Sequence, residues 1–411
     1  MKSELNQLMA DRNLEAVVIL ASHDYSAPLD YLVGSVHITG GMAWKKRDAD
    51  PILVVNGMEI EEARASKLTC YTYSDFGYYE LFAQANNDPM KANVALWGVI
   101  LDRLGIKGGK IGIYGTNEVH QIVALVDMLR GTYPQFSFVG ESGATLFDQA
   151  ALTKSADELA RIQSVAKRTN DVLEATWNFI AGHDVVDEVV MKGHNTPLTI
   201  GDVRTFVRRS LLERGLEDTG MIFAQGRDAG FPHSRGQDEM PLRLGQSIVF
   251  DLFPRELGGG YHHDVTRTWC IGYAPQEVYD LYHQVMTAFD IAVESYALNK
   301  PTHLMQEAVQ DYFENLGHPT LRNEPNTQFG YTHSLGHGLG LKIHERPRIT
   351  HSSQEDVFAV GNVITIEPGL YYPEKGVGIR IEDSFYITED GELVSLTPFR
   401  KDLVLPMVRK S

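Results

Sequence analysis

The feature that most constrains this chain is a strand–turn–strand pattern near its C-terminal end that brings two acids together. Residues 363–367 and 379–387 alternate apolar and polar side chains, as half-buried strands do. Residues 373–376 between them have the composition of a turn. Folding back about the centre of that turn places Glu367 directly opposite Glu382. Two like charges directly opposite each other destabilise a sheet, so we expect a cation between these carboxylates.

A second hairpin of the same kind is expected upstream. Residues 247–251 and 264–268 are predicted to be strands on either side of a glycine-rich turn, which places Asp251 opposite Asp264. Pro254 cannot donate to a ladder, so we expect the pairing to loosen just after Asp251. The alternative is that these acids are ordinary, solvated strand residues. A single pair of acids would leave that alternative open. Two pairs, with a histidine in a glycine-rich loop downstream, favour a metal site.

Length, charge and cysteine content limit the other possibilities. A chain of 411 residues is too long for one ordinary core and suits two domains. The net charge of −17 would repel nucleic acid, so no nucleic-acid partner is expected. The sequence contains no apolar run long enough to span a bilayer, so no membrane partner is expected. The only cysteines, Cys70 and Cys270, are far apart and imply no disulfide framework, which makes the cytoplasm the expected compartment.

The pattern of elements predicts two domains of different class. Strands alternating with helices predict an α/β amino-terminal domain over residues 1–150, with both faces of its sheet covered. The boundary is expected near residues 140–153. Ser155 and Glu158 then form a capping box, and apolar residues at helical spacing predict a long helix that opens the second domain, residues 151–411. Helices interleaved with antiparallel hairpins in this domain predict an α+β fold, with a curved sheet backed by helices.

The two acid pairs and the histidine occur in the order Asp251, Asp264, His337, Glu367, Glu382. Their flanking motifs are Val265-Thr266-Arg267-Thr268, His344-Glu345-Arg346-Pro347 and Pro368-Gly369. In this order and context the chain resembles the pita-bread metallopeptidases, a family that includes methionine aminopeptidase, aminopeptidase P, prolidase and the metal-free relative creatinase. The resemblance covers roughly Ser155 to the C-terminus. The preceding part is similar to the amino-terminal domain of the aminopeptidase P, prolidase and creatinase branch.

The resemblance implies a fold and a set of metal ligands. The fold would be a creatinase-like α/β amino-terminal domain followed by a pita-bread catalytic domain, in a homodimer. By resemblance, Asp264 and Glu382 bridge two divalent ions, Asp251 completes one ion, and His337 with Glu367 completes the other. Four carboxylates are more than one ion needs, and with one imidazole they favour Mn²⁺, with Co²⁺ or Zn²⁺ as alternatives. A hydroxide between the ions would attack the scissile carbonyl, and Glu367 would carry its proton.

The resemblance also assigns roles to residues around the metals. His233 matches the family's substrate histidine near the scissile amide, and His344 matches the group that stabilises the tetrahedral oxyanion. His333 and Tyr371 match the aminopeptidase P pocket around proline. A structural role is the alternative for any single histidine, but the fixed offsets from the ligands favour function.

Four further positions belong to the expected site or its surroundings. Arg380 shares strand parity with Glu382, so it should point into the same cavity as a substrate-binding residue. His262 and His263 have no family role and are expected to be structural or to lie at the substrate rim. The family often has glycine two residues after the first metal aspartate, whereas Phe253 stands there in this chain, which affects the pocket wall and not the ligands.

The sequence therefore predicts a two-metal hydrolase of the Xaa-Pro peptide bond, acting as an aminopeptidase or a dipeptidase on peptides with proline in the second position. One alternative is a hydrolase or lyase of another small amide or acid on the same fold. A non-catalytic binding scaffold is the other, and the intact ligand set disfavours both it and creatinase. The amino-terminal domain disfavours methionine aminopeptidase. The preferred first residue and the choice between dipeptides and longer substrates stay open.

Overall fold

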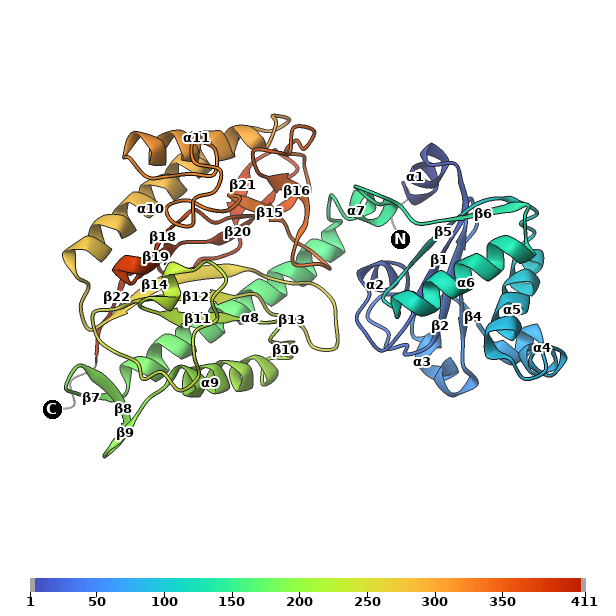
Figure 1. The fold of residues 1–411 in the computed structure, drawn as a ribbon, viewed down its shortest axis with the longest axis horizontal. Coiled ribbons are helices and arrows are strands. Elements are labelled where there is room, and N and C mark those ends of the chain that lie inside the picture. The colour runs from blue at the N-terminus through green and yellow to red at the C-terminus, as the bar shows by residue number, and fades with distance from the viewer. Residues whose placement is uncertain (1–3, 408–411) are drawn as a thin grey trace. The chain divides into compact units, whose positions relative to one another are not determined.

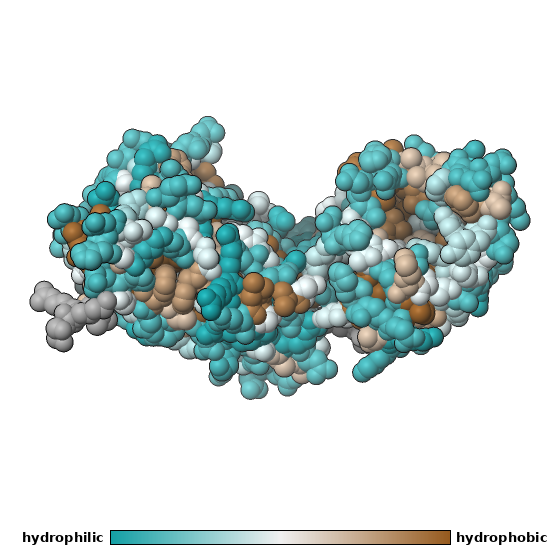
Figure 2. All heavy atoms as spheres, turned by 90° about the horizontal axis from the view of Figure 1, so that it is seen from below, coloured by the Kyte–Doolittle hydropathy of each residue, from teal (hydrophilic) through white to brown (hydrophobic). Residues whose placement is uncertain are grey.

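The computed structural model describes residues 4–407, which form two compact units. One unit runs up to Ala150 and includes Gly258–Gly260, and the other comprises the remainder from Ala151. Each unit has hydrophobic clusters of its own. On the face drawn in Figure 2, the surface of each is mostly hydrophilic, with hydrophobic residues in small separate areas. Within the described residues, no helix is long and apolar enough to cross a membrane.

The first unit is built on a six-stranded mixed sheet with the order β4-β3-β2-β1-β5-β6 (Figure 1). Its strands are β1 (Leu14–Ala21), β2 (Gly41–Lys46), β3 (Ile52–Val55), β4 (Thr69–Thr72), β5 (Gly109–Gly115) and β6 (Phe136–Val139). Its α-helices are α1 (Leu5–Asp11), α2 (Ala27–Val33), α3 (Ile60–Arg64), α4 (Tyr78–Gln84), α5 (Pro89–Arg103), α6 (Val119–Thr132) and α7 (Leu146–Ala150), with 3-10 turns η1 (Gly57–Glu59) and η2 (Tyr73–Phe76).

The central strand β1 explains why helices cover both faces of this sheet. Successive side chains of a strand point to opposite faces. Ala16 and Val18 belong to one hydrophobic cluster, and Val17 and Ile19 belong to another. The expected burial of both faces is therefore confirmed.

The second unit combines several smaller sheets with four α-helices among the described residues. The main sheets have the orders β11-β12-β14-β22 and β16-β15-β17-β20-β21, and β18 pairs with β19. Smaller sheets have the orders β7-β8-β9 and β10-β13.

The helices are α8 (Ala156–Ala181), α9 (Ile200–Leu212), α10 (Gln276–Glu294) and α11 (His303–Asn315), with 3-10 turns η3 (Asp228–Gly230) and η4 (Pro373–Lys375). The strands are β7 (Asp184–Val186), β8 (Val189–Gly193), β9 (Thr196–Pro197), β10 (Leu216–Glu217), β11 (Ile222–Gln225), β12 (Ser247–Leu252), β13 (Arg255–Glu256), β14 (Val265–Ile271), β15 (Gly336–Gly338), β16 (Glu345–Ile349), β17 (Val363–Ile366), β18 (Gly369–Tyr372), β19 (Val377–Arg380), β20 (Asp383–Ile387), β21 (Leu393–Ser395) and β22 (Val404–Leu405).

Helices back the sheets of the second unit from two sides. Figure 1 shows α8 and α9 along one side and α10 and α11 along the other, with the strands between them. Helix α8 begins at the expected capping box, in which the Ser155 amide donates to Glu158 Oε2 at 2.7 Å. Its apolar stripe packs on β12 and β14, while α10 and α11 pack on β17 and β20.

The register expected for the C-terminal hairpin is confirmed. In the ladder of β17 with β20, Ile366 lies opposite Asp383, and in the ladder of β18 with β19, Gly369 lies opposite Arg380. Both ladders have the register that sets Glu367 against Glu382. The pairing nevertheless breaks between the two ladders, which belong to different sheets, and the amides of Glu367 and Glu382 donate to the carbonyl oxygens of Leu335 and Thr266 instead. Both glutamates lie at that break.

The register expected for the upstream hairpin is wrong by two residues. Asp251 lies opposite Thr266 and not opposite Asp264. Strand β12 ends at Leu252, and after Pro254 the short strand β13 pairs with β10 instead. A shift of two residues preserves the face of a strand, so Asp264 still lies on the same side as Asp251.

Candidate metal centre and active site

One cavity of about 710 Å³ in the second unit gathers the acids and the histidine predicted as ligands. Its walls carry Asp251, Asp264, His337, Glu367 and Glu382. Asp251 and His337 lie within β12 and β15, whereas the other three lie just outside strand ends, where the ladders stop. The chain therefore brings all five predicted ligands to one place from five separate segments.

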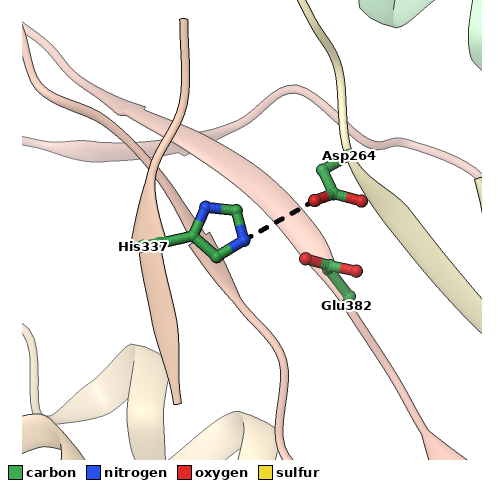
Figure 3. A group of neighbouring side chains, drawn as sticks. All are labelled: Asp264, His337 and Glu382. Carbon is green, nitrogen blue, oxygen red and sulfur yellow. Dashed lines mark ion pairs between the residues drawn. The ribbon is translucent and has the colours of Figure 1, made fainter. Parts of the chain in front are cut away.

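Three of these residues form the centre of the group. Figure 3 shows Asp264, His337 and Glu382 pointing toward one another, and one ligand atom from each lies within 4.8 Å of the others. His337 Nε2 is 3.6 Å from Asp264 Oδ2 and 3.6 Å from Glu367 Oε1. Burial lowers the pKa of His337 to about 3, so its ring is neutral. Since Nδ1 lies 3.0 Å from the Gly338 carbonyl oxygen and donates to it, Nε2 presents a lone pair to the carboxylates.

Three carboxylates of the cavity each have one oxygen without a hydrogen-bond partner among the described residues. Within residues 4–407, Asp251 Oδ1, Asp264 Oδ1 and Glu382 Oε1 are buried and accept no hydrogen bond. Burial, followed by the negative charge of Glu382, holds the pKa of Asp264 well above its usual range. Burial and then Asp251 raise the pKa of Glu382 to about 8, and burial and then Glu382 raise that of Glu367. Buried carboxylate oxygens without a partner, facing a neutral imidazole lone pair, fit a site for divalent cations.

One buried cation already compensates part of this charge. Arg380 donates from Nη2 to Asp251 Oδ2 at 2.5 Å and from Nε to Thr266 Oγ1 at 3.2 Å. Thr266 in turn donates to Glu382 Oε2 at 2.8 Å. Arg380 lines the cavity, as its strand parity predicted. Arg235 and Arg348 also line the cavity, but both are exposed, so Arg380 is the buried cation that lies among the four carboxylates.

Thr266 is a site residue that the sequence analysis missed. It links Arg380 to Glu382 and lies opposite Asp251. Its strand parity with Asp264 was a usable signal, because residues two apart on a strand share a face.

A hydrogen-bonded chain connects His333 to Arg380 through Tyr371. His333 Nδ1 lies 2.7 Å from the Ser334 carbonyl oxygen, and Nε2 lies 2.9 Å from the Tyr371 hydroxyl. Burial lowers the pKa of His333 to about 3. The neutral ring donates from Nδ1, so Tyr371 donates its proton to Nε2 and accepts from Arg380 Nη1 at 2.8 Å. His333 lines the cavity, while the fully buried Tyr371 lies behind it.

The other predicted histidines separate into two groups. His233 and His344 are exposed to the cavity and line it, and the rings of His337 and His344 meet edge to face with centroids 4.4 Å apart. His262 and His263 are buried: His262 Nδ1 lies 3.1 Å from the Gly340 carbonyl oxygen and His263 Nε2 lies 3.1 Å from Thr397 Oγ1. Their contacts are those of structural residues.

Known proteins are similar to this chain in sequence and in fold. The family model described as metallopeptidase family M24 matches residues 160–389, more than half of the chain. The chain is 34% identical over 208 residues to the Xaa-Pro dipeptidase of Pyrococcus furiosus, covering 50% of this chain and 54% of that protein. It is 24% identical over 366 residues to the Xaa-Pro dipeptidase of Lactobacillus helveticus, covering 88% of this chain and 87% of that protein.

A solved structure has the same fold over nearly its whole length. The crystal structure of a dipeptidase from Pyrococcus horikoshii matches with a TM-score of 0.74 and 20% sequence identity, covering 98% of both chains. This likeness confirms the expected α+β class with its helix-backed antiparallel sheets.

Proposed function

Since the chain belongs to metallopeptidase family M24, we propose that it hydrolyses the peptide bond between a first residue and proline with the help of two divalent metal ions. The observation that carries the proposal is the meeting of four acids and one neutral imidazole in a single cavity. The names of the two relatives above support the choice of the Xaa-Pro bond. Both dipeptides and longer peptides with proline in the second position are included in this substrate class.

We assign the ions to the five residues of the cavity. Asp264 and Glu382 would bind both ions, Asp251 would complete one, and His337 with Glu367 would complete the other. The buried carboxylate oxygens without partners in residues 4–407 support this assignment. When bound, the ions supply Lewis-acid activation of the scissile carbonyl and of a water nucleophile.

Glu367 is the proposed proton carrier. A general acid–base group must lie within hydrogen-bond reach of the proton that it takes. The Glu367 carboxylate lines the cavity, with Oε1 3.6 Å from His337 Nε2, and so would lie beside the ions and the nucleophile that they activate. It would take the proton of the nucleophile and pass it to the leaving nitrogen of proline.

Two histidines are proposed to handle the scissile amide. His344 would donate an N–H to the carbonyl oxygen as negative charge develops there, a role that fits a neutral ring exposed to the cavity. Burial lowers the pKa of His344, which keeps that ring neutral. His233 would hold the substrate near the amide from another part of the same wall.

His333 is proposed to form the wall against the proline ring. The nitrogen of an acylated proline has no proton to donate, so an enzyme that prefers proline must recognise the shape of the ring. The hydrogen bonds from Tyr371 and to Ser334 fix the plane of the His333 imidazole. A fixed wall fits one ring shape better than a mobile one does.

The remaining assignments rest on chemistry and resemblance. Mn²⁺ is proposed as the ion because carboxylates dominate the ligand set. A homodimer is proposed from the family resemblance, and a cytoplasmic location from the two cysteines that form no disulfide.

The proposal is tested with a panel of Xaa-Pro dipeptides and longer peptides that begin Xaa-Pro, assayed with several divalent ions. Hydrolysis should require added metal and should release the first residue. Elemental analysis of the purified protein should find close to two ions per chain. A metal-loaded protein that cleaves none of these peptides would contradict the proposal and favour the hydrolysis of another small amide.

A further inference from the structure

We infer that a buried ion pair between Lys154 and Glu345 positions His344 in the cavity wall. The inference concerns a positioning role and rests on the proposed function, in which His344 contacts the carbonyl oxygen. Neither Lys154 nor Glu345 lines the cavity. The pair would act through the loop that leads from β15 to β16.

The pair is among the most buried ionic contacts of the second unit. Lys154 Nζ lies 2.7 Å from Glu345 Oε2, and each side chain is only 2% exposed. Nζ also donates to the Ala151 carbonyl oxygen at 2.5 Å, and the Lys154 amide donates to the Gly361 carbonyl oxygen at 2.7 Å. Removing one partner of such a pair, or moving it away, leaves an uncompensated buried charge. This cost in free energy keeps the Lys154 and Glu345 side chains together.

Glu345 holds the loop from within. Its second oxygen, Oε1, accepts from the Lys342 amide at 3.0 Å. The carboxylate also packs directly on Gly340, where an added Cβ would lie 2.4 Å and 2.6 Å from the two oxygens. The loop therefore wraps around the carboxylate, and a side chain at residue 340 would have to displace that carboxylate.

The opposite side of the loop is fixed as well. The Gly340 carbonyl oxygen accepts from the His262 amide at 2.9 Å and lies 3.1 Å from His262 Nδ1. The Leu339 amide donates to the Val363 carbonyl oxygen at 2.9 Å. Glu345 on one side and these groups on the other therefore hold the loop at Leu339, Gly340 and Lys342.

His344 depends on this backbone for its orientation. No side chain of residues 4–407 hydrogen-bonds to its imidazole, and its ring contact is with His337. Glu345 follows it directly, so the carboxylate that holds the loop also sets the position of the His344 Cα. Moving a catalytic group by about 1 Å can cost roughly 100-fold in rate.

The test compares four variants with a matched control. Lys154→Met removes the cation, Glu345→Gln keeps the shape of the anion without its charge, the double variant combines both, and Lys154→Arg restores a cation. Lys167→Met is the control, because Lys167 pairs with Asp171 at 3.1 Å on the exposed surface of α8. Hydrogen exchange of residues 338–346, bound metal, kcat and KM for Ala-Pro are measured on each folded, metal-loaded protein.

Loss of the pair should loosen the loop and slow the reaction at saturating substrate. In Lys154→Met and Glu345→Gln, exchange of residues 338–346 should rise by roughly tenfold or more, and kcat should fall roughly 10- to 100-fold with KM and metal content little changed. Because the two residues act as one unit, the double variant should be no worse than the more affected single variant. Lys154→Arg should recover most of kcat, and Lys167→Met should match the wild type.

Two results would overturn the inference. One is a loop that exchanges at the wild-type rate in both single variants, and the other is a kcat that is unchanged in both. If Lys154→Met does not fold, the exchange rate and kcat of the milder variant Glu345→Gln decide whether the inference holds. The exchange measurement needs no substrate, so a wild type inactive on every Xaa-Pro peptide would refute the proposed function while the loop result still decides the role of the pair.

Discussion

Arg380 and Asp251 form a buried ion pair, in which Nη2 lies 2.5 Å from Oδ2. The same guanidinium donates to the Tyr371 hydroxyl, which in turn holds His333. One arginine therefore connects the predicted metal ligands to the predicted proline wall. A substitution on either side of Arg380, among the metal ligands or at the proline wall, should therefore affect the other side.

Asp264→Asn should abolish metal binding and activity together. Asparagine has the size of aspartate but lacks the charge that a bridging ligand needs. Because the Asp264 carboxylate is buried among other acids, the metal-free variant should be no less stable than the metal-free wild type. Elemental analysis, hydrolysis of Ala-Pro and thermal melting check the three expectations.

The control for that variant is Asp290→Asn, which removes a carboxylate from the exposed face of α10. It should keep both metal and activity. Full activity in Asp264→Asn would remove Asp264 from the ligand set.

The metal-free protein should lose stability as the pH rises. A carboxyl group with a higher pKa in the folded chain than in the unfolded chain holds more protons when folded. Its contribution to stability is present below the unfolded value of 4.5 and is lost as the pH rises through the folded value, about 8 for Glu382. The melting temperature of metal-free protein should therefore fall between pH 5.5 and pH 8.5.

Saturating metal should reverse that trend, because ions bind the deprotonated carboxylates and compete with protons. Glu382→Gln removes a titrating group and should flatten the fall in the metal-free protein. A metal-free wild type that becomes more stable over this range would show that the acids are ionised and compensated in some other way.

Tyr371→Phe should weaken the preference for proline without removing metal. The substitution keeps the ring but deletes the hydroxyl that donates to His333 Nε2 and accepts from Arg380 Nη1. The ratio of kcat/KM for Ala-Pro to that for Ala-Ala should fall, because His333 loses one of the two hydrogen bonds that fix the plane of its ring. Steady-state kinetics on both dipeptides measure the ratio.

Tyr372→Phe is the matched control, since its hydroxyl bonds to His318 Nδ1 at 2.5 Å and the residue does not line the cavity. It should leave the ratio unchanged. An equal loss for both dipeptides in Tyr371→Phe would give Tyr371 a role in catalysis and not in selectivity.

The sequence predicted the features that depend on local pattern. Strand alternation around a short turn predicted the register in which Glu367 lies opposite Glu382. The capping box of Ser155 and Glu158 predicted the start of α8. Both are encoded within a few residues. The parity of Arg380 with Glu382 was likewise enough to place Arg380 in the cavity.

The features that the sequence did not predict depend on long-range partners. The predicted register of Asp251 was wrong because β13 pairs with β10. No sequence pattern within the hairpin indicates that pairing. The partner of Arg380 is Asp251, 129 residues away, and that of Lys154 is Glu345, 191 residues away. Such contacts are determined by tertiary packing and leave no periodic signal.

The most direct test of the central claim is the preference of the metal-loaded wild type for proline in the second position. Ala-Pro is compared with Ala-Ala, and Ala-Pro-Ala with Ala-Ala-Ala. A cavity fitted to the proline ring loses apolar contacts with alanine, so kcat/KM should favour the proline peptides by roughly 10- to 200-fold. Equal rates within each pair would contradict the account and leave a metallopeptidase without proline specificity.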